Sequence, residues 1–252
     1  MKLLLRIRFL GTAYAGYQVQ KNANTVQAEL NRATEALLGF PCDIVGCSRT
    51  DSGVHANEFC CTVTKKGSGS LETSLPADRF PRALSCLLPE DIGVTSAEWV
   101  REDFHPRYDV RYKEYVYRIH AAYERDPFLV GRALTYKHPI DDEAFTRMQR
   151  AACDFCGEHD FSAFMAAGSK VQSTVRCVEY ARLERDGDLI TFSVAANGFL
   201  YNMVRIMVGT LLDVAEGKID ADAIPTILAS HDRSLAGFTA PPCGLYLNRV
   251  VY

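Results

Sequence analysis

The order of apolar patterns along the first half of the chain limits its fold more than any other feature. Residues 3–10 alternate between apolar and other side chains, with Arg6 and Arg8 on the second face, which predicts a half-buried strand with a basic outer face. A helix begins with Asn24 or Thr25 as its N-cap and ends near Gly39. Similar patterns predict strands at 42–45, 59–64 and 92–100 and a helix at 76–87. This order of elements, strand–helix–strand–strand–helix–strand, is typical of a split βαβ unit.

The second half repeats this alternation in outline. Its predicted elements are strands at 111–120, 174–184, 189–195 and 245–251 and helices at 141–152, 199–215 and 221–230. The second and third of these strands form a hairpin across Gly187. The predicted fold class is therefore α+β, with two similar halves, 1–103 and 104–252, that share one mostly antiparallel sheet flanked by helices.

The composition is that of a globular protein without an obvious polyanionic partner. The chain has 252 residues, of which 48% are hydrophobic and 23% charged, enough for one large domain or two small ones with a sizeable core. A formal net charge of −3 argues mildly against nucleic acid as a partner, unless basic groups gather on one face. Arg6, Arg8 and Lys21 lie in an N-terminal stretch without acids and are candidates for such a face.

Neither a membrane span nor a secretory leader is expected. Arg6 and Arg8 interrupt the apolar start of the chain, and the longest nearly uncharged run, 189–212, is broken by Asn197 and Gly198. Nine cysteines in such a chain fit a reduced, cytoplasmic protein that uses them as small core residues.

A metal centre is the alternative use of the cysteines. Cys153, Cys156 and His159 have the spacing of half a zinc site, but no second pair follows at finger-like spacing. We therefore expect no metal, and a metal-dependent hydrolase built on these three residues is the weakest alternative.

Residues 46–56, Gly-Cys-Ser-Arg-Thr-Asp-Ser-Gly-Val-His-Ala, concentrate groups that donate, accept or exchange protons between two apolar runs. Two interpretations are open. The stretch is either a tight turn whose Asp51 and Ser52 cap backbone amides, or a loop between buried strands that presents reactive groups. A hydrolase triad of Ser52, Asp51 and His55 is disfavoured, because the three are too close in sequence and lack a strand–Gly-x-Ser-x-Gly–helix context.

Arg205 favours the second interpretation. It lies in an apolar helical run, between Val204 and Ile206, and a buried unpaired charge there costs several kcal/mol. Its guanidinium either reaches the edge of the helix or finds an acid from the other half, for which Asp51 is the attractive candidate. A guanidinium partner would keep the Asp51 carboxylate ionised and oriented.

Residues 46–56 closely resemble the catalytic loop of the TruA-type tRNA pseudouridine synthases, in which Gly-Arg-Thr-Asp-Ala-Gly-Val-His is usual. The resemblance continues in order through 14–20 with 25–27, 104–107, 113–117, 157–161, 199–205 with 208–211, and 240–242 with 244–247. Ser48, Ser52 and Pro106 depart from the family pattern without removing a catalytic group.

The resemblance implies a pseudouridine synthase fold and the isomerisation of uridine to pseudouridine at positions 38 to 40 of the tRNA anticodon stem-loop. It also implies the roles of five residues. Asp51 is the catalytic carboxylate, and Arg49 helps to hold the target nucleotide out of its stem. Tyr115 stacks on the extruded uracil, although Tyr117 shares its strand face. Arg205 pairs with Asp51, and Leu245 lines the base pocket, whereas His55 is expected only to anchor the loop.

The resemblance further implies a cytoplasmic homodimer that acts on tRNA and needs neither cofactor nor metal, because the isomerisation involves no redox change. The alternative is a non-catalytic RNA-binding protein on the same scaffold. Arg49, Asp51, Tyr115 and Arg205 together argue against it, since binding alone has no use for a paired carboxylate.

Overall fold

The computed structural model describes residues 1–168 and 171–252, and these divide into two compact units. Unit 1 comprises Met1–Arg111 with Tyr246–Tyr252, and unit 2 comprises Tyr112–Leu245. Both contain helices and sheet, so the predicted α+β class is confirmed. The predicted division between residues 103 and 104 stays a prediction, while the last strand joins the first unit.

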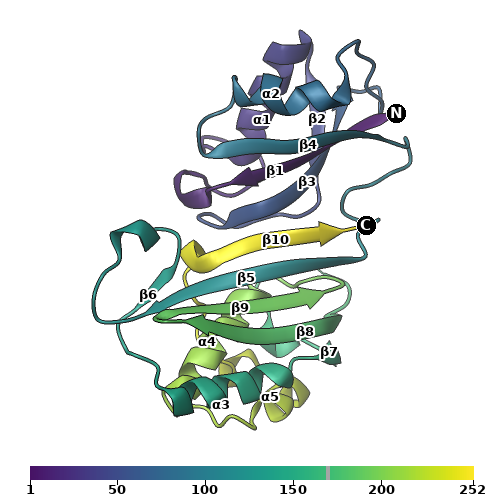
Figure 1. Cartoon of the computed structure of the whole chain (residues 1–252). Helices are drawn as coiled ribbons and strands as arrows, with labels where there is room; N and C mark the ends of the chain where they lie inside the picture. The colour runs from purple at the N-terminus through teal and green to yellow at the C-terminus, as the bar shows by residue number, and fades with distance from the viewer. Residues whose placement is uncertain (169–170) are drawn as a thin grey trace. The chain divides into compact units, whose positions relative to one another are not determined.

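Unit 1 combines strands with α-helices that lie beside them (Figure 1). Its elements are β1 (Lys2–Phe9), α1 (Val26–Leu38), β2 (Cys42–Gly46), β3 (His55–Lys65), α2 (Phe80–Ser85), β4 (Ile92–Val100) and β10 (Leu245–Val251). The strand order is β4-β1-β3-β10, with β2 also paired to β3. All pairs are antiparallel except β10 with β3.

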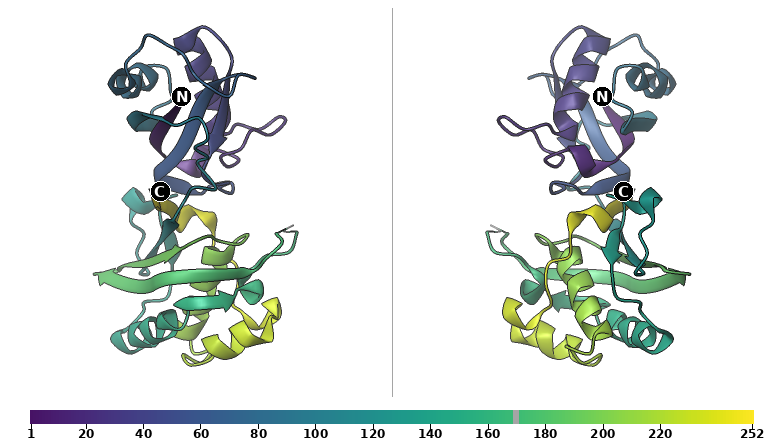
Figure 2. Two further views of the ribbon diagram at one scale, coloured as in Figure 1. Left: turned by 90° about the vertical axis from the view of Figure 1, so that its right-hand side faces the viewer. Right: turned by 90° about the vertical axis from the view of Figure 1, so that its left-hand side faces the viewer.

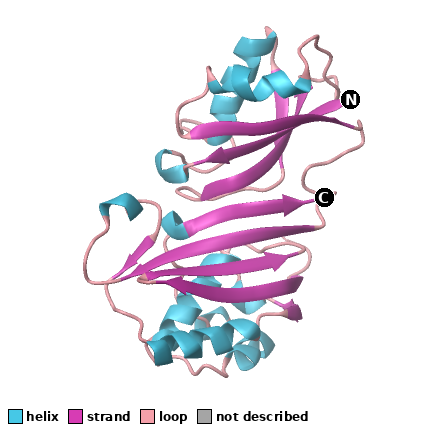
Figure 3. Ribbon diagram, viewed as in Figure 1, coloured by secondary structure: helices cyan, strands magenta, loops and turns pink. Residues whose placement is uncertain are grey.

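The core of unit 1 follows from the predicted alternation. Leu3, Leu5, Ile7 and Phe9 on β1 are at most 4% exposed. Val26, Leu30 and Ala33 form the buried stripe of α1, which packs against β2, and α2 packs against β4. Figure 3 shows α1 and α2 together beside the strands of this unit. Burying side chains of this kind contributes about 1.5–3 kcal/mol each.

Unit 2 combines the other strands with three α-helices among its described residues. Its elements are β5 (Tyr112–Ala121), β6 (Leu134–Tyr136), α3 (Asp142–Cys153), β7 (Gly157–Asp160), β8 (Val175–Asp186), β9 (Leu189–Ala196), α4 (Met203–Ala215) and α5 (Ile224–Ser230). The strand order is β5-β9-β8-β7, with the short β6 parallel to β5. Helix α3 packs on α4 and β8, and both views of Figure 2 show the three helices close together against the strands.

Two differences from the sequence prediction have clear physical reasons. Helix α4 begins at Met203 rather than at residue 199, because Asn202 has a φ of 60° and cannot continue a right-handed helix. The strands β6 and β7 have only 3 and 4 residues, too few to show a period of two. Among the described residues, no helix is long and apolar enough to cross a membrane.

Helix α3 offers a test of the local structure of unit 2. The Asp141 carboxylate accepts a hydrogen bond from the Ala144 amide at 2.8 Å and caps the helix. Asp141→Ala should lower the free energy of unfolding by about 1 kcal/mol, because an amide loses its partner and the helix dipole loses a counter-charge. Urea denaturation measures the change.

Glu143→Ala is the matched control for this cap. It removes a carboxylate from the same turn, but one that is 87% exposed and pairs with Arg147 at 3.2 Å. Its expected cost is below about 0.5 kcal/mol. Equal losses in the two variants would show that Asp141 acts only through surface charge.

Candidate functional site

The loop that connects β2 to β3 carries two of the predicted site residues. The first hydrogen bond beyond the β2–β3 ladder runs from the Cys47 amide to the Cys60 carbonyl oxygen at 2.8 Å. Beyond it the chain leaves the sheet and returns at His55. In this loop Arg49 is exposed and Asp51 is half-buried. The loop therefore presents its charged groups from a base fixed by two strands.

A second segment, residues 11–17, holds this loop, and we call it the bracing segment. The Gly11 amide donates to Nδ1 of His55 at 2.8 Å. The Gly53 amide and the Ser52 hydroxyl both donate to the Tyr14 carbonyl oxygen, at 3.3 and 3.2 Å. The Tyr17 amide donates to the Thr50 carbonyl oxygen at 3.2 Å. These four bonds flank Asp51 in sequence on both sides.

Glycine is required where the bracing segment meets the loop. A Cβ on Gly11 would lie 2.0 Å from the Val54 carbonyl oxygen. Gly16 has a φ of +95°, and its Cβ would lie 2.4 Å from the Thr50 carbonyl oxygen. Backbone approaches backbone too closely here for any side chain. Sequence reasoning missed this function of the bracing segment, although its glycines were the available signal.

The structure explains why Ser52 and His55 do not form a triad with Asp51. The Ser52 hydroxyl is engaged by the Tyr14 carbonyl oxygen. His55 is fully buried, accepts the Gly11 amide, and stacks on Tyr246 with ring centroids 4.6 Å apart. These contacts agree with the expected anchoring of the loop by His55.

In unit 2 the structure distinguishes the two tyrosines of β5. Tyr117 is fully buried, and its hydroxyl donates to the Pro241 carbonyl oxygen at 2.7 Å. Burial raises the pKa of this phenol. Tyr115 is 7% exposed and packs edge-on against Phe199, with ring centroids 4.9 Å apart. Tyr117 therefore holds the turn at Pro241, and Tyr115 belongs to an aromatic pair.

Arg205 lies half-buried in the first turn of α4. Its Nε donates to the Ala240 carbonyl oxygen at 2.7 Å, and its Nη1 donates to Oδ1 of Asn202 at 2.8 Å. The Ala240 amide in turn donates to the Arg205 carbonyl oxygen at 3.0 Å. The segment that leads to β10 thus fixes the orientation of the guanidinium. Leu245, at the end of this segment, is 6% exposed.

Arg205, Tyr117 and Leu245 are therefore connected through residues 240–245 within unit 2. Gly244 allows this approach, since a Cβ there would lie 2.6 Å from the Tyr117 ring and from the Arg118 carbonyl oxygen. Asp51 belongs to unit 1, so its pairing with Arg205 stays a prediction. The same holds for the catalytic and binding roles of the five predicted residues.

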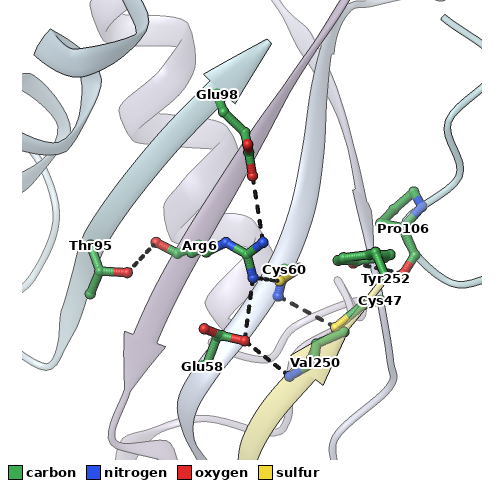
Figure 4. A network of polar contacts seen from close by, with 9 residues as sticks. All are labelled: Arg6, Cys47, Glu58, Cys60, Thr95, Glu98, Pro106, Val250 and Tyr252. Atoms are coloured by element: carbon green, nitrogen blue, oxygen red, sulfur yellow. Dashed lines mark hydrogen bonds and ion pairs between the residues drawn. The ribbon is translucent and has the colours of Figure 1, made fainter. Parts of the chain in front are cut away.

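Arg6, a predicted member of a basic face, is instead neutralised within unit 1 (Figure 4). Its Nη1 lies 3.3 Å from Oε1 of Glu58, and its Nη2 lies 3.5 Å from Oε1 of Glu98. The Glu58 carboxylate also accepts the Val250 amide at 3.0 Å. The strand register produces these contacts, because Arg6 pairs with Cys60 on β3 and with Ser96 on β4. Arg6 is thus a poor phosphate ligand.

The cysteines near this network are core residues. Cys47, Cys60 and Cys61 are fully buried, and the Cys60 amide donates to Sγ of Cys47 at 3.4 Å. Burial raises the pKa of the Cys60 thiol to about 12, which keeps it protonated. Within residues 1–168 and 171–252, no three His, Cys, Asp or Glu side chains are arranged to hold a metal ion.

Known proteins that resemble this chain show which class and family it belongs to. A family model described as tRNA pseudouridine synthase matches residues 151–252, which include β8, α4 and β10. This match, together with the relatives described below, assigns the chain to the class of pseudouridine synthases. A solved structure, "Crystal Structure of a Cbf5-Nop10-Gar1 Complex", matches at a TM-score of 0.35 and 15% identity over 97% of this chain and 48% of the other, too weakly to add to the assignment.

Relatives of full length make the assignment specific. The chain is 45% identical to tRNA pseudouridine synthase A of Acetivibrio thermocellus over 98% of both chains. It is 42% identical to the protein of the same name from a Thermoanaerobacter species over 99% of both chains. The corresponding protein of Halalkalibacterium halodurans is 43% identical over 97% of this chain and 90% of the relative. The chain belongs to the tRNA pseudouridine synthase A family.

The bracing segment yields a direct test. Gly11→Ala should displace the loop, because the new Cβ would overlap the Val54 carbonyl oxygen. We expect a lower melting temperature and faster hydrogen–deuterium exchange of the amides in residues 47–56.

Gly93→Ala is the control, since its Cβ would meet only Cγ of Arg8 at 3.6 Å, an ordinary contact. This variant should exchange like the unaltered protein. Unchanged exchange of residues 47–56 in Gly11→Ala would contradict the bracing.

Proposed function

We propose that this chain isomerises uridine to pseudouridine in tRNA, with targets at positions 38 to 40 of the anticodon stem-loop. Identity of 45% to a tRNA pseudouridine synthase A across 98% of the chain carries the proposal. In this reaction the bond from C1′ of the ribose to N1 of uracil breaks, and a bond from C1′ to C5 forms. C5 loses a proton and N1 gains one, so the product is an isomer of the substrate.

Asp51 is the proposed catalytic carboxylate, acting at the sugar of the target nucleotide. The bracing segment supports this role, because four hydrogen bonds around Asp51 fix its backbone before the substrate arrives. Catalytic groups that need no reorganisation are the effective ones. Arg49, exposed two residues earlier, is proposed to hold the target nucleotide out of its stem.

Tyr115, Arg205 and Leu245 are the proposed contributions of unit 2. Tyr115 is the better stacking partner for the uracil, because it is 7% exposed whereas Tyr117 is fully buried. Base–aromatic stacking is worth roughly 1–3 kcal/mol. Arg205 is proposed to keep the Asp51 carboxylate ionised, and Leu245 to line the base pocket. We further propose that the protein acts as a homodimer in the cytoplasm.

The activity is tested with an unmodified tRNA transcript. Incubation with the purified protein should produce pseudouridine at one or more of positions 38 to 40, detected by carbodiimide adducts that stop reverse transcription. A transcript with cytidine at these positions should give no such stops. A folded protein that forms no pseudouridine in any uridine-containing transcript would refute the proposal.

The role of Asp51 is tested separately. Asp51→Asn should lower turnover by more than about 100-fold while changing tRNA affinity by less than about tenfold, since the amide keeps the shape but loses the carboxylate. Single-turnover kinetics and filter binding measure the two effects.

Asp43→Asn, on the strand that leads into the same loop, is the matched control. Its carboxylate only accepts the Gly67 amide at 2.9 Å, so turnover should be retained. A non-catalytic RNA-binding protein would instead show no effect of Asp51→Asn on any product. Equal losses of affinity and turnover in Asp51→Asn would make this residue structural.

A further inference from the structure

The arginines of unit 2 differ in how their charge is satisfied. Four of them pair with nearby carboxylates: Arg147 with Glu143, Arg150 with Asp154, Arg182 with Glu184 and Arg185 with Asp142. Arg176, at the start of β8, has no carboxylate within 4.0 Å among the described residues. It is half-buried, so its cation lacks both full hydration and a counter-ion.

The guanidinium of Arg176 is nevertheless held in place. Its Nη1 donates to the Ser173 carbonyl oxygen at 2.9 Å and to the Val175 carbonyl oxygen at 2.6 Å. These two bonds use both protons of Nη1. In the described part of the chain, Nε and Nη2 have no protein acceptor. The N–H groups of Nε and Nη2 form the edge of an arginine that binds two oxygens of a phosphate side by side.

Arg176 also lies near the proposed base-stacking pair. A Cβ on Gly198 would come within 3.2 Å of Nε and 3.4 Å of Cδ of Arg176, so this side chain lies directly over Gly198. The next residue, Phe199, packs against Tyr115 at 4.9 Å. The strand register places Tyr115, Val194 and Ala196 on one face of the sheet, and Gly198 follows Ala196 by two residues. Arg176 thus covers Gly198, and Gly198 directly precedes Phe199 of the aromatic pair.

Arg233 is a second arginine of unit 2 that is half-buried and has no carboxylate partner among the described residues, so it provides a comparison. Burial lowers the pKa of both guanidinium groups, and no carboxylate opposes the effect in either case. Arg233, however, donates from Nη1 to the Ala236 carbonyl oxygen and from Nη2 to Oγ1 of Thr239, both at 3.2 Å. These two bonds connect Arg233 to residues of its own segment. Of these two guanidinium groups, Arg176 keeps its Nε and Nη2 edge without an acceptor among the described residues.

We infer that Arg176 binds a phosphate of the RNA substrate through its Nε and Nη2 edge, next to the nucleotide that stacks on Tyr115. This inference rests on the proposed function, because it takes the RNA to be the substrate of that site. An RNA phosphodiester fits better than a protein carboxylate, since a nucleotide stacked on Tyr115 carries its phosphates within the same neighbourhood. Arg176 is thus a positioning residue that fixes the backbone of the target nucleotide.

The first test measures tRNA affinity as a function of salt. Arg176→Gln should weaken binding of an unmodified tRNA transcript by about tenfold and reduce the slope of log K against log salt by about 0.7 to 0.9, the contribution of one phosphate contact. Arg176→Lys should restore the slope but only part of the affinity, because an ammonium group cannot bind two oxygens side by side.

Arg182→Gln is the matched control on the same strand. Its guanidinium is paired with Glu184 at 3.6 Å and lies over the Tyr180 ring, so affinity and slope should not change. Thermal unfolding of each variant excludes a folding defect. Equal slopes for Arg176→Gln and the unaltered protein would overturn the inference.

The second test identifies the phosphate. Neutral methylphosphonates are placed singly along a synthetic anticodon stem-loop RNA, and the binding of each RNA is measured with the unaltered protein and with Arg176→Gln. One position near the target uridine should weaken binding to the unaltered protein yet have no further effect in the variant. If the effects of the methylphosphonate and of Arg176→Gln on binding were additive at every position, the inference would be overturned. A protein that forms pseudouridine but shows only additive effects would leave the proposed function intact.

Discussion

The hydrogen bond from the Gly11 amide to Nδ1 of His55 connects the end of β1 to the start of β3, and the Asp51 loop depends on it. The two strands are already neighbours, because β1 and β3 pair antiparallel from Leu3 with Val63 to Phe9 with Ala56. The chain that leaves β1 therefore emerges beside the chain that enters β3. A loop in this position lies against the backbone of the bracing segment rather than free in solvent.

This arrangement explains how a polar loop keeps one conformation. Loops are usually the mobile parts of a domain, yet a catalytic carboxylate needs a fixed position. Here the backbone groups of Thr50 and Gly53 and the Ser52 hydroxyl are bound to residues 14–17, and these bonds restrain the backbone on both sides of Asp51. The glycines at 11 and 16 are what permits such close backbone contact. Stability and function in this part of unit 1 therefore rest on the same bonds.

Sequence periodicity predicted most elements of this unit, although β3 begins at His55 rather than at the predicted residue 59. The strands at 92–100 and 245–251 agree with β4 and β10, and Thr25 caps α1 as expected. Periodicity could not predict contacts that depend on register between strands. Whether Arg6 faces an RNA phosphate or Glu58 is decided by β1 pairing with β3 and β4, and no local pattern records that pairing. For the same reason, alternation placed Tyr115 and Tyr117 on one face without distinguishing them.

The formal net charge is −3, so the number of cationic side chains does not by itself explain RNA binding. What matters is which of these side chains are already neutralised by carboxylates. A phosphate contact requires a guanidinium that does not have to abandon a carboxylate, since breaking such a pair leaves a charge uncompensated. Arg6 fails this condition because it pairs with Glu58 and Glu98. Arg233 has no carboxylate to abandon among the described residues, but its Nη1 and Nη2 already donate to Ala236 and Thr239. The distribution of donors around each arginine, rather than the total charge, then determines where an acidic chain can hold RNA. By this criterion Arg176 on β8 is the strongest phosphate-binding candidate among these arginines of unit 2.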